Sequence, residues 1–436
     1  MDDHEEVVEW AVKMERLPEE ATLQSRLRRG EVGPELVEAL ARRISSFHAH
    51  ADAGDHISVF GRFEAVARNA RENFEQAAPH VGTTISRSVC ERLRSLTEEA
   101  LTSLYPLIQR RADRGMPRDT HGDLHLDHVY LFPDRTPPDD LVIIDCIEFN
   151  ERFRFADPVA DMAFLVMDLS FHGRSDLARV FSEAYFRTTG DEEGRTLLPF
   201  YTAYRAAVRG KVEGIELFEK EIPETERAAA LTRARAHWLL ALGELERPNR
   251  RPCLVLVGGL PGTGKSTLAR GLASQAGFSV IRSDVVRKKL AGLPDSGQMS
   301  AAFGDGIYSP EWTERTYAEC LRQAEGLLFE GKRVLVDASF CEEKRRRTFL
   351  QTATDSGVPG VLLVCKANAD TVRARLQARR DDASDADWSI HQRVAESWQK
   401  PSNLTEQSLR EIATSASGEQ ALSDTLQVLR VLSLFD

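Results

Sequence analysis

The stretch Cys253-Leu-Val-Leu-Val-Gly-Gly-Leu-Pro-Gly-Thr-Gly-Lys-Ser266 decides how the second half of the chain folds. Its first five residues are apolar, which predicts a strand that is buried on both faces, as in a parallel sheet. From Gly259 onward it matches G-x-x-x-x-G-K-[ST] at every fixed position. The residues that follow, from Thr267, are typical of a helix. Strand, glycine-rich turn and helix in this order predict a phosphate-binding loop.

The glycine-rich turn has the chemistry of an ATP site with Mg²⁺. Its glycines let successive backbone N–H groups face one anion, and the N-terminus of the next helix adds free N–H groups and partial positive charge. Lys265 would bring a full charge to the β- and γ-phosphates, and the Ser266 hydroxyl would ligate Mg²⁺. A glycine-rich turn that binds no ligand is the alternative. The predicted nucleotide-binding residues are Gly259, Leu260, Pro261, Gly262, Thr263, Gly264, Lys265, Ser266 and Thr267.

The rest of the second half is typical of a parallel α/β sheet. Apolar runs that predict buried strands alternate with helical segments, and they occupy residues 253–257, 278–282, 333–336 and 360–365. Ligands of such sheets bind at the carboxyl ends of the strands. Asp284 follows the second run, where it would accept a proton from an attacking hydroxyl. Asp337 ends the third run and would support Mg²⁺ or contact the substrate.

Three arginines are candidates for holding phosphate groups. Arg287 lies one helical turn after Asp284 and would hold an anionic acceptor or the moving phosphoryl group. The alternative for this pair is an N-cap aspartate with an exposed arginine. Arg375 and Arg379 lie four residues apart, just before a polar loop, where they would close over the triphosphate and stabilise transferred charge. For these two, a solvated amphipathic helix face is the alternative.

Residues from about 250 to 436 resemble the small P-loop kinases, most closely the group of polynucleotide kinases, gluconate kinases and zeta toxins. The resemblance rests on the glycine-rich loop, on Ser283-Asp-x-x-Arg287, on Val336-Asp-Ala-Ser-Phe340 and on the arginines before the polar loop. It implies transfer of the γ-phosphoryl group of ATP to a hydroxyl. By the same resemblance Asp284 would be the general base, and Arg375 or Arg379 the lid residue.

A second candidate site lies in the first half, at His121-Gly-Asp123-Leu-His-Leu-Asp-His128. A pattern typical of a β-hairpin follows it, with strands at 128–132 and 141–144. Asp145 comes directly after the second strand. Kinases use this order, in which the first acid orients the acceptor hydroxyl and the second holds Mg²⁺. These roles would fall to Asp123 and Asp145.

His121-Gly-Asp123 resembles the aminoglycoside-phosphotransferase family, and Asp157-Pro-Val-Ala-Asp161 is similar to that family's segment after the metal-binding acid. The whole chain resembles two-domain proteins that join such a region to a P-loop ATPase. Two features depart from the family. His128 stands where the family has a magnesium-binding Asn, and imidazole is a poor ligand for that cation. Only a short strand, at residues 5–14, precedes the first helix, so most of an N-lobe is missing.

The N-terminal segment and the histidines leave alternatives open. Lys13 echoes the ATP-binding lysine of kinases, with Glu19 or Glu20 as its partner, but no glycine-rich loop precedes it. We therefore expect the first half to bind ATP weakly or not at all. A further alternative is a zinc site with the ligands His121, Asp123, His125 and His128. An ordered loop whose histidine makes a structural hydrogen bond is the simpler interpretation.

Composition limits the remaining possibilities. The 436 residues are 42% hydrophobic and 29% charged, which fits a folded protein of two or three domains, and the polar stretch 246–252 divides them into domains 1–248 and 249–436. The net charge of −11 disfavours nucleic acid as a partner, except as a 5′-end substrate. Scattered cysteines, an acidic N-terminus and the lack of any apolar run of about 18 residues predict a cytoplasmic protein that does not enter a membrane.

Together these patterns predict an α/β protein in which a mainly helical, kinase-like domain with a β-hairpin precedes a parallel-sheet P-loop domain. The expected function is a kinase that uses ATP and Mg²⁺ and phosphorylates a small molecule or a nucleotide. The alternative is an ATP-binding switch whose nucleotide state alters how the two halves pack.

Overall fold

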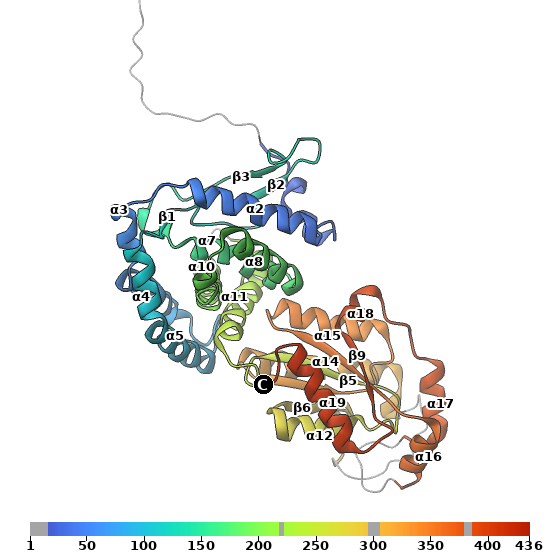
Figure 1. Cartoon of the computed structure of the whole chain (residues 1–436). Helices are drawn as coiled ribbons and strands as arrows, with labels where there is room; N and C mark the ends of the chain where they lie inside the picture. Colours follow the sequence, from blue (N-terminus) through green and yellow to red (C-terminus); the bar gives the residue numbers. More distant parts are fainter. Residues whose placement is uncertain (1–15, 218–221, 295–305, 379–385) are drawn as a thin grey trace, which may run out of the picture.

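The computed structural model describes residues 16–217, 222–294, 306–378 and 386–436. It has the expected α/β architecture, in which a helical first half with short antiparallel ladders precedes a five-stranded parallel sheet (Figure 1). The strand expected at 5–14, including Lys13, lies outside the described residues. Among the helices that are described, none combines the length and the apolar character needed to cross a membrane.

Helices build most of the first half, as the periodicity of its sequence predicts. The longer ones are α2 (Pro34–His50), α4 (Phe63–Ala77), α5 (Arg87–Asp113), α7 (Pro158–Phe171), α8 (Ser175–Thr189), α10 (Leu198–Glu216) and α11 (Glu224–Leu245). The shorter ones are α1 (Leu23–Arg28), α3 (Asp55–Ser58), α6 (Glu151–Arg154) and α9 (Glu192–Arg195). α7 is buried from Pro158 to Leu169, because its sequence is apolar all round, and α8, α10 and α11 pack against it.

Two short antiparallel ladders hold the His121–His128 loop in the first half. β1 (Arg118–Asp119) comes just before the loop and pairs with β4 (Phe155–Ala156). β2 (Val129–Leu131) comes just after it and pairs with β3 (Leu141–Ile143), which confirms the predicted hairpin. Both ends of the loop are therefore fixed by backbone hydrogen bonds.

The second half contains a wholly parallel sheet with the strand order β6-β7-β5-β8-β9. Its strands are β5 (Cys253–Gly258), β6 (Ser279–Arg282), β7 (Arg333–Asp337), β8 (Gly360–Lys366) and β9 (Leu409–Ala413). The four apolar runs predicted the first four strands. The fifth, β9, was not predicted, because Arg410 and Glu411 interrupt its sequence and leave no apolar run.

Helices cover both faces of this sheet. Along β5 the side chains alternate, so that Val255 and Val257 face α12 (Lys265–Ala276) and α19 (Gly418–Val431), whereas Leu254 and Leu256 face α14 (Pro310–Phe329) and α15 (Glu343–Asp355). The other helices of this half are α13 (Ser283–Leu290), α16 (Ala369–Ala378), α17 (Trp388–Glu396) and α18 (Asn403–Ser408).

The two halves share one hydrophobic core, which runs from the α14 and α15 side of the sheet into the helices of the first half. Where α15 ends, Gly357 approaches α11 so closely that a Cβ atom would lie 2.3 Å from the Ala236 carbonyl oxygen. The Ser88 hydroxyl of α5 donates a 2.6 Å hydrogen bond to Glu330, just after α14. The proposed boundary between residues 248 and 249 falls between α11 and β5, and the division into two domains there stays a prediction.

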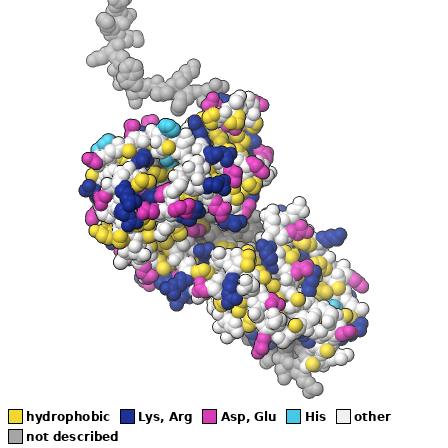
Figure 2. Space-filling model, viewed as in Figure 1, with side chains coloured by type: hydrophobic (Ala, Val, Ile, Leu, Met, Phe, Trp, Pro, Cys, Tyr) yellow, Lys and Arg dark blue, Asp and Glu magenta, His cyan; other side chains and the backbone are white. Residues whose placement is uncertain are grey.

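Acidic and basic side chains are interspersed with apolar ones over the face of the molecule shown in Figure 2. This mixture fits a chain in which 68 acidic residues face 57 basic ones. The net negative charge is therefore not gathered into one extended acidic surface on the face in view.

We expect Leu256→Ala to lower the free energy of unfolding by about 2–5 kcal/mol. Leu256 is fully buried in the middle strand of the sheet, and its truncation leaves a cavity. Leu404→Ala is the matched control, because Leu404 is 54% exposed, and its cost should stay near about 0.5 kcal/mol. Urea denaturation followed by circular dichroism measures both values. Equal losses would contradict the placement of Leu256 in the core.

Candidate functional site

The glycine-rich loop leaves the sheet at the end of β5 and runs into α12, as predicted. Three of its glycines have positive φ angles, at 135° for Gly259, 80° for Gly262 and 95° for Gly264. A Cβ atom at Gly259 would lie 2.6 Å from the Cys365 carbonyl oxygen, and one at Gly262 would lie 2.9 Å from Leu376. Neither the backbone angles nor the space around the loop therefore allow a larger residue at these positions.

Hydrogen bonds from within the loop and from distant parts of the chain restrain the loop. The Lys265 ammonium group donates to the Leu260 carbonyl oxygen at 2.9 Å. The Thr414 hydroxyl, just after β9, donates to the Thr263 carbonyl oxygen at 2.6 Å. The His391 Nδ1 atom of α17 lies 2.8 Å from the Pro261 carbonyl oxygen. These contacts engage three carbonyl oxygens of the loop and restrain its backbone.

Ser266 and Asp337 meet beside the loop. The Ser266 hydroxyl donates a 2.6 Å hydrogen bond to Asp337 Oδ2, and the Arg282 Nε atom lies 3.6 Å from the same carboxylate oxygen. Strand register explains this meeting, since Asp337 lies opposite Val257 of β5 and opposite Arg282 of β6. A hydroxyl and a buried carboxylate supply the oxygen atoms that Mg²⁺ prefers, so these residues fit the ion that ATP carries.

Asp284 and Arg287 lie on α13, which starts where β6 ends. Asp284 is half-buried at the same edge of the sheet as Asp337. Arg287 is 7% exposed, and its Nη1 atom donates to the Ile307 carbonyl oxygen at 2.7 Å and to Thr313. The N-cap of α13 is Arg282, so the alternative of an N-cap aspartate with an exposed arginine is wrong. The proposed catalytic roles of Asp284 and Arg287 stay predictions.

Arg375 faces the loop from α16. Its Nη2 atom donates to the Thr414 carbonyl oxygen at 2.7 Å, and its Nη1 atom lies 3.3 Å from where a Cβ atom of Gly264 would be. This Nη1 atom is buried and has no hydrogen-bond partner among the described residues. A cavity of about 340 Å³ opens beside it and is lined by Gly262, Gly264, Thr267, Leu268, Arg375, Ala378, Thr414, Gly418 and Ala421. The second arginine of this helical segment, Arg379, lies outside the described residues.

The acids of the first half lie around His128. The Asp123 carboxylate accepts a 2.8 Å hydrogen bond from His125 Nε2, and His128 Nδ1 lies 2.8 Å from the Asp123 carbonyl oxygen. On the other side, His128 Nε2 lies 3.5 Å from Asp145, whose side chain is 74% exposed. Burial acts to raise the pKa of Asp123, but the hydrogen bond and the charges of the two histidines outweigh burial and lower this pKa to about 2.

Asp161 of α7 anchors the start of the His121–His128 loop by hydrogen bonds, a role that its sequence position alone did not indicate. It is fully buried and accepts hydrogen bonds from the backbone N–H of His121 at 3.3 Å and of Gly122 at 2.8 Å. The His48 Nε2 atom of α2 donates to the same carboxylate at 3.0 Å. The His121 ring lies 2.8 Å from the Ile144 carbonyl oxygen, as the interpretation of a structural hydrogen bond predicts.

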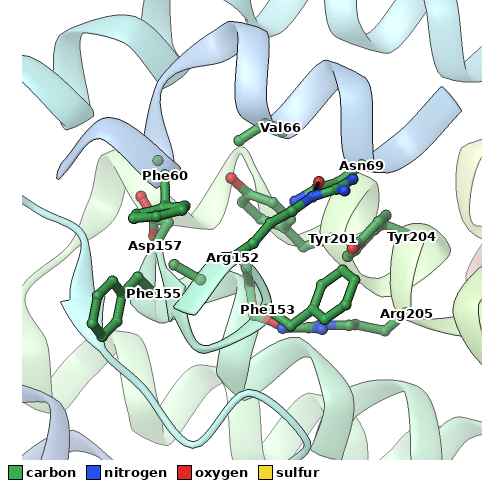
Figure 3. Close-up of a pocket in the computed structure, with 13 residues that line it drawn as sticks. Phe60, Val66, Asn69, Arg152, Phe153, Phe155, Asp157, Tyr201, Tyr204 and Arg205 are labelled. Atoms are coloured by element: carbon green, nitrogen blue, oxygen red, sulfur yellow. Dashed lines mark hydrogen bonds between the residues drawn. The ribbon is translucent and has the colours of Figure 1, made fainter. Parts of the chain in front are cut away.

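A smaller hollow in the first half lies next to β4 and α6 (Figure 3). Figure 3 shows Arg152 reaching toward Asn69, to which its Nε atom donates a 2.6 Å hydrogen bond. Aromatic side chains, among them Phe153 and Tyr204, line the hollow, and its volume is about 30 Å³. That space holds about one water molecule, so this hollow is not a substrate site.

Sequence reasoning missed three residues that shape the nucleotide loop: Arg282, His391 and Thr414. Arg282 stands at a strand end, which is a weak sign of a site residue. Neither His391 nor Thr414 lies in a recognisable motif, and both reach the loop only through the tertiary fold.

Residues 254–401 match the family described as AAA domain. This match includes the glycine-rich loop, so the second half contains a P-loop domain. The uncharacterized proteins Mb2027c of Mycobacterium bovis and MT2060 and Rv2004c of Mycobacterium tuberculosis are each 34% identical to the chain over 378 residues, which cover 86% of the chain and 73% of each relative.

Two solved structures that the chain matches are kinases by description. One is a sugar kinase from Janibacter sp. HTCC2649, 15% identical, with 42% of this chain and 99% of that chain covered and a TM-score of 0.32. The other is a gluconokinase from Sinorhizobium meliloti 1021, 18% identical, with 42% and 95% covered and a TM-score of 0.31.

We expect Lys265→Ala to weaken the binding of Mg-ATP by about tenfold or more. The substitution removes the ammonium group held beside the loop, and a hydrogen bond to a charged group contributes about 1.5–3 kcal/mol. Lys344→Ala is the matched control, because the Lys344 side chain is 78% exposed. Isothermal titration calorimetry on the full chain measures both affinities. An unchanged affinity in Lys265→Ala would remove the loop from the binding site.

We expect the stabilising effect of Asp123 to disappear in acid. Its pKa of about 2 lies below the ordinary value of 3.8, so its ionised form stabilises the fold above about pH 4, and this contribution is lost as the pH falls toward 2. The difference in melting temperature between the wild type and Asp123→Asn should therefore become smaller as the pH falls from 5 to 2. Asp134→Asn, at an exposed turn residue, is the control. A difference that does not change with pH would refute this assignment.

Proposed function

The chain belongs to the family of the three mycobacterial proteins that it matches, and on that premise we propose that it is an ATP-dependent phosphotransferase. The reaction would pass the γ-phosphoryl group of ATP to a hydroxyl of a small molecule or nucleotide. The observation that supports this proposal most is the buried Nη1 atom of Arg375, which lacks a hydrogen-bond partner among the described residues and faces the glycine-rich loop. A guanidinium group in this position would form charge-assisted hydrogen bonds with an anion bound in the loop.

The residues around the loop divide the binding of Mg-ATP between them. Bound Mg-ATP supplies an electrophilic γ-phosphoryl group. Lys265 and the N-terminal amides of α12 would hold the phosphate oxygens, and Arg375 would neutralise charge on the opposite side of Gly264. The Ser266 hydroxyl oxygen would ligate the metal. Its O–H group would keep donating the 2.6 Å hydrogen bond to Asp337.

Asp284 would act on the acceptor. It is half-buried on the first turn of α13, at the carboxyl end of β6, where acceptors of parallel-sheet proteins bind. A carboxylate there would receive the proton of the attacking hydroxyl. Arg287 is already bound to Ile307 and Thr313, so we propose that it fixes α13 against α14 and thereby positions Asp284.

For the first half we propose a role in acceptor choice or docking, with ATP bound weakly or not at all. Asp123 and Asp145 lie on either side of His128, so the position of the magnesium-binding Asn in the aminoglycoside-phosphotransferase family is filled by an imidazole that contacts both acids. All six cysteines are unpaired, which supports the expected cytoplasmic location.

A nucleotide-dependent switch is a second candidate, and the position of α14 favours it. Near its start, Thr313 and Tyr317 contact Arg287 and the Ser339 hydroxyl, close to the proposed acceptor site. At its end, the Phe329 ring lies under Arg235 of α11, with 4.6 Å between the guanidinium carbon and the ring centroid. One helix therefore connects the edge of the nucleotide site with the other half of the chain.

We expect ADP release by the full chain to depend on an acceptor and to fall about 100-fold or more in Asp284→Asn, since general-base catalysis contributes about 10²–10⁴-fold. Chromatographic detection of ADP against a panel of sugars, sugar acids, nucleosides and aminoglycosides measures this. Asp370→Asn is the matched control, because the Asp370 side chain is 97% exposed. Release that is indifferent to every acceptor and unchanged in Asp284→Asn would favour the switch over the kinase.

The same calorimetry on the full-length Lys265→Ala variant tests the role of the first half. We expect no residual micromolar affinity for Mg-ATP, because the remaining candidate site would have to hold the nucleotide through Asp123 and Asp145 alone. Residual micromolar binding that is lost on adding Asp145→Asn would show a second nucleotide site and contradict the proposed role.

A further inference from the structure

A group of possible metal ligands lies where the His121–His128 loop meets α7. One ligand atom each from His125, Asp127 and Asp168 lies within 4.8 Å of the other two. His125 and Asp168 are 5% and 6% exposed, whereas Asp127 is exposed to solvent. The loop supplies two of these side chains, and the third comes from α7. The kinase chemistry proposed above uses none of the three.

The Nδ1 atom of His125 is directed toward this group. Its Nε2 atom lies 2.8 Å from the Asp123 carboxylate, which accepts the proton. Nδ1 is therefore the ring nitrogen that is left to bind an ion. Nδ1 has no hydrogen-bond partner among the described residues and lies 3.9 Å from Asp168 Oδ2. A cation placed between these two atoms would be bound by both of them.

Asp168 is held in place for such a cation. Its Oδ2 atom accepts a 2.9 Å hydrogen bond from the backbone N–H of Leu126, which fixes the carboxylate beside the loop. Its Oδ1 atom lies 3.7 Å from the Nε2 atom of His172, the residue that follows α7. This Nε2 atom is buried, and no side chain or backbone group of the described ranges forms a hydrogen bond with it. The His172 ring is therefore placed within reach of an ion bound to Asp168.

We propose that His125, Asp127 and Asp168 bind a divalent transition-metal ion of the zinc class, with His172 next to the fourth position. Nitrogen and carboxylate ligands together suit such an ion, whereas Mg²⁺ prefers oxygen ligands alone. The ligand set differs from the zinc alternative drawn from the sequence. There, His121 is bound to Ile144 and His128 to the Asp123 carbonyl oxygen, so these two rings point elsewhere.

The ion would stabilise the fold of the first half and fix the orientation of Asp123. It would tie the loop between β1 and β2 to the end of α7, the central helix of the first half. Because the Asp123 carboxylate binds the far nitrogen of a ligand ring, it stands in the position from which carboxylates orient metal-bound histidines. Asp123 would therefore be a positioning residue for the ion, and the ion in turn would fix where Asp123 points.

Zinc titration of the metal-free full chain tests this proposal. We expect one Zn²⁺ per chain by equilibrium dialysis with elemental analysis, and a visible absorption band from Co²⁺ bound at the same site. Asp127→Asn should weaken Zn²⁺ binding by about tenfold or more without loss of folding, since Asp127 is exposed. Asp134→Asn makes the same change at an exposed acid outside the group and should leave the affinity unchanged.

A positioning role for Asp123 adds a second readout. Asp123→Asn should weaken Zn²⁺ about 10- to 100-fold and change the Co²⁺ spectrum, as loss of an outer carboxylate does in other metal sites. Absence of stoichiometric binding, or binding that Asp127→Asn and His172→Gln leave unchanged, would overturn the proposal. Zinc binding and phosphotransfer are measured separately, so failure of one leaves the other standing.

Discussion

The tight bend after β5 is the constraint on which the nucleotide site depends. β5 lies between β7 and β8, and its backbone leaves the sheet at Gly259. A Cβ atom added to Gly259 would lie 2.6 Å from the Cys365 carbonyl oxygen. A larger residue would have to push the ends of β5 and β8 apart. Because the bend is this tight, α12 begins directly above the sheet, and Ser266 reaches the carboxylate that ends β7. The site is thus a consequence of strand register rather than of any single side chain.

The glycine-rich loop and the His121–His128 loop offer an anion very different surroundings. At the C-terminal sheet edge, the start of α12, Lys265 and Arg375 gather positive charge around the glycine-rich loop. The loop of the first half instead presents Asp123, ionised down to a pH of about 2, and the exposed Asp145. A triphosphate brought there meets like charges, whose repulsion must be offset by a cation. Electrostatics therefore favours the second half as the place where a nucleotide binds.

Much of this arrangement could be predicted from the sequence, and the reasons for the exceptions are physical. The phosphate loop was predictable because its glycines, Lys265 and Ser266 act over a few consecutive residues. The three central strands β5, β7 and β8 were predictable because burial makes them almost continuously apolar, whereas β9, at one edge, carries Arg410 and Glu411 and shows no such run. The contacts of Thr414 and Asp161 were not predictable, because each joins segments that only the tertiary fold brings together.

The shared core limits how the two halves can respond to a nucleotide. Leu254 and Leu256 belong to the same buried cluster as the helices of the first half, so moving the halves apart would expose apolar surface. Exposing about 200 Å² would cost about 5 kcal/mol. A ligand must supply about 5.5 kcal/mol of differential affinity to move an equilibrium from 1:99 to 99:1. Separation of the halves would therefore carry a cost almost as large as that whole difference in affinity, whereas a small shift along α14, from Thr313 to Phe329, would expose little surface. Any communication between the halves is accordingly expected to travel as a small displacement of that helix.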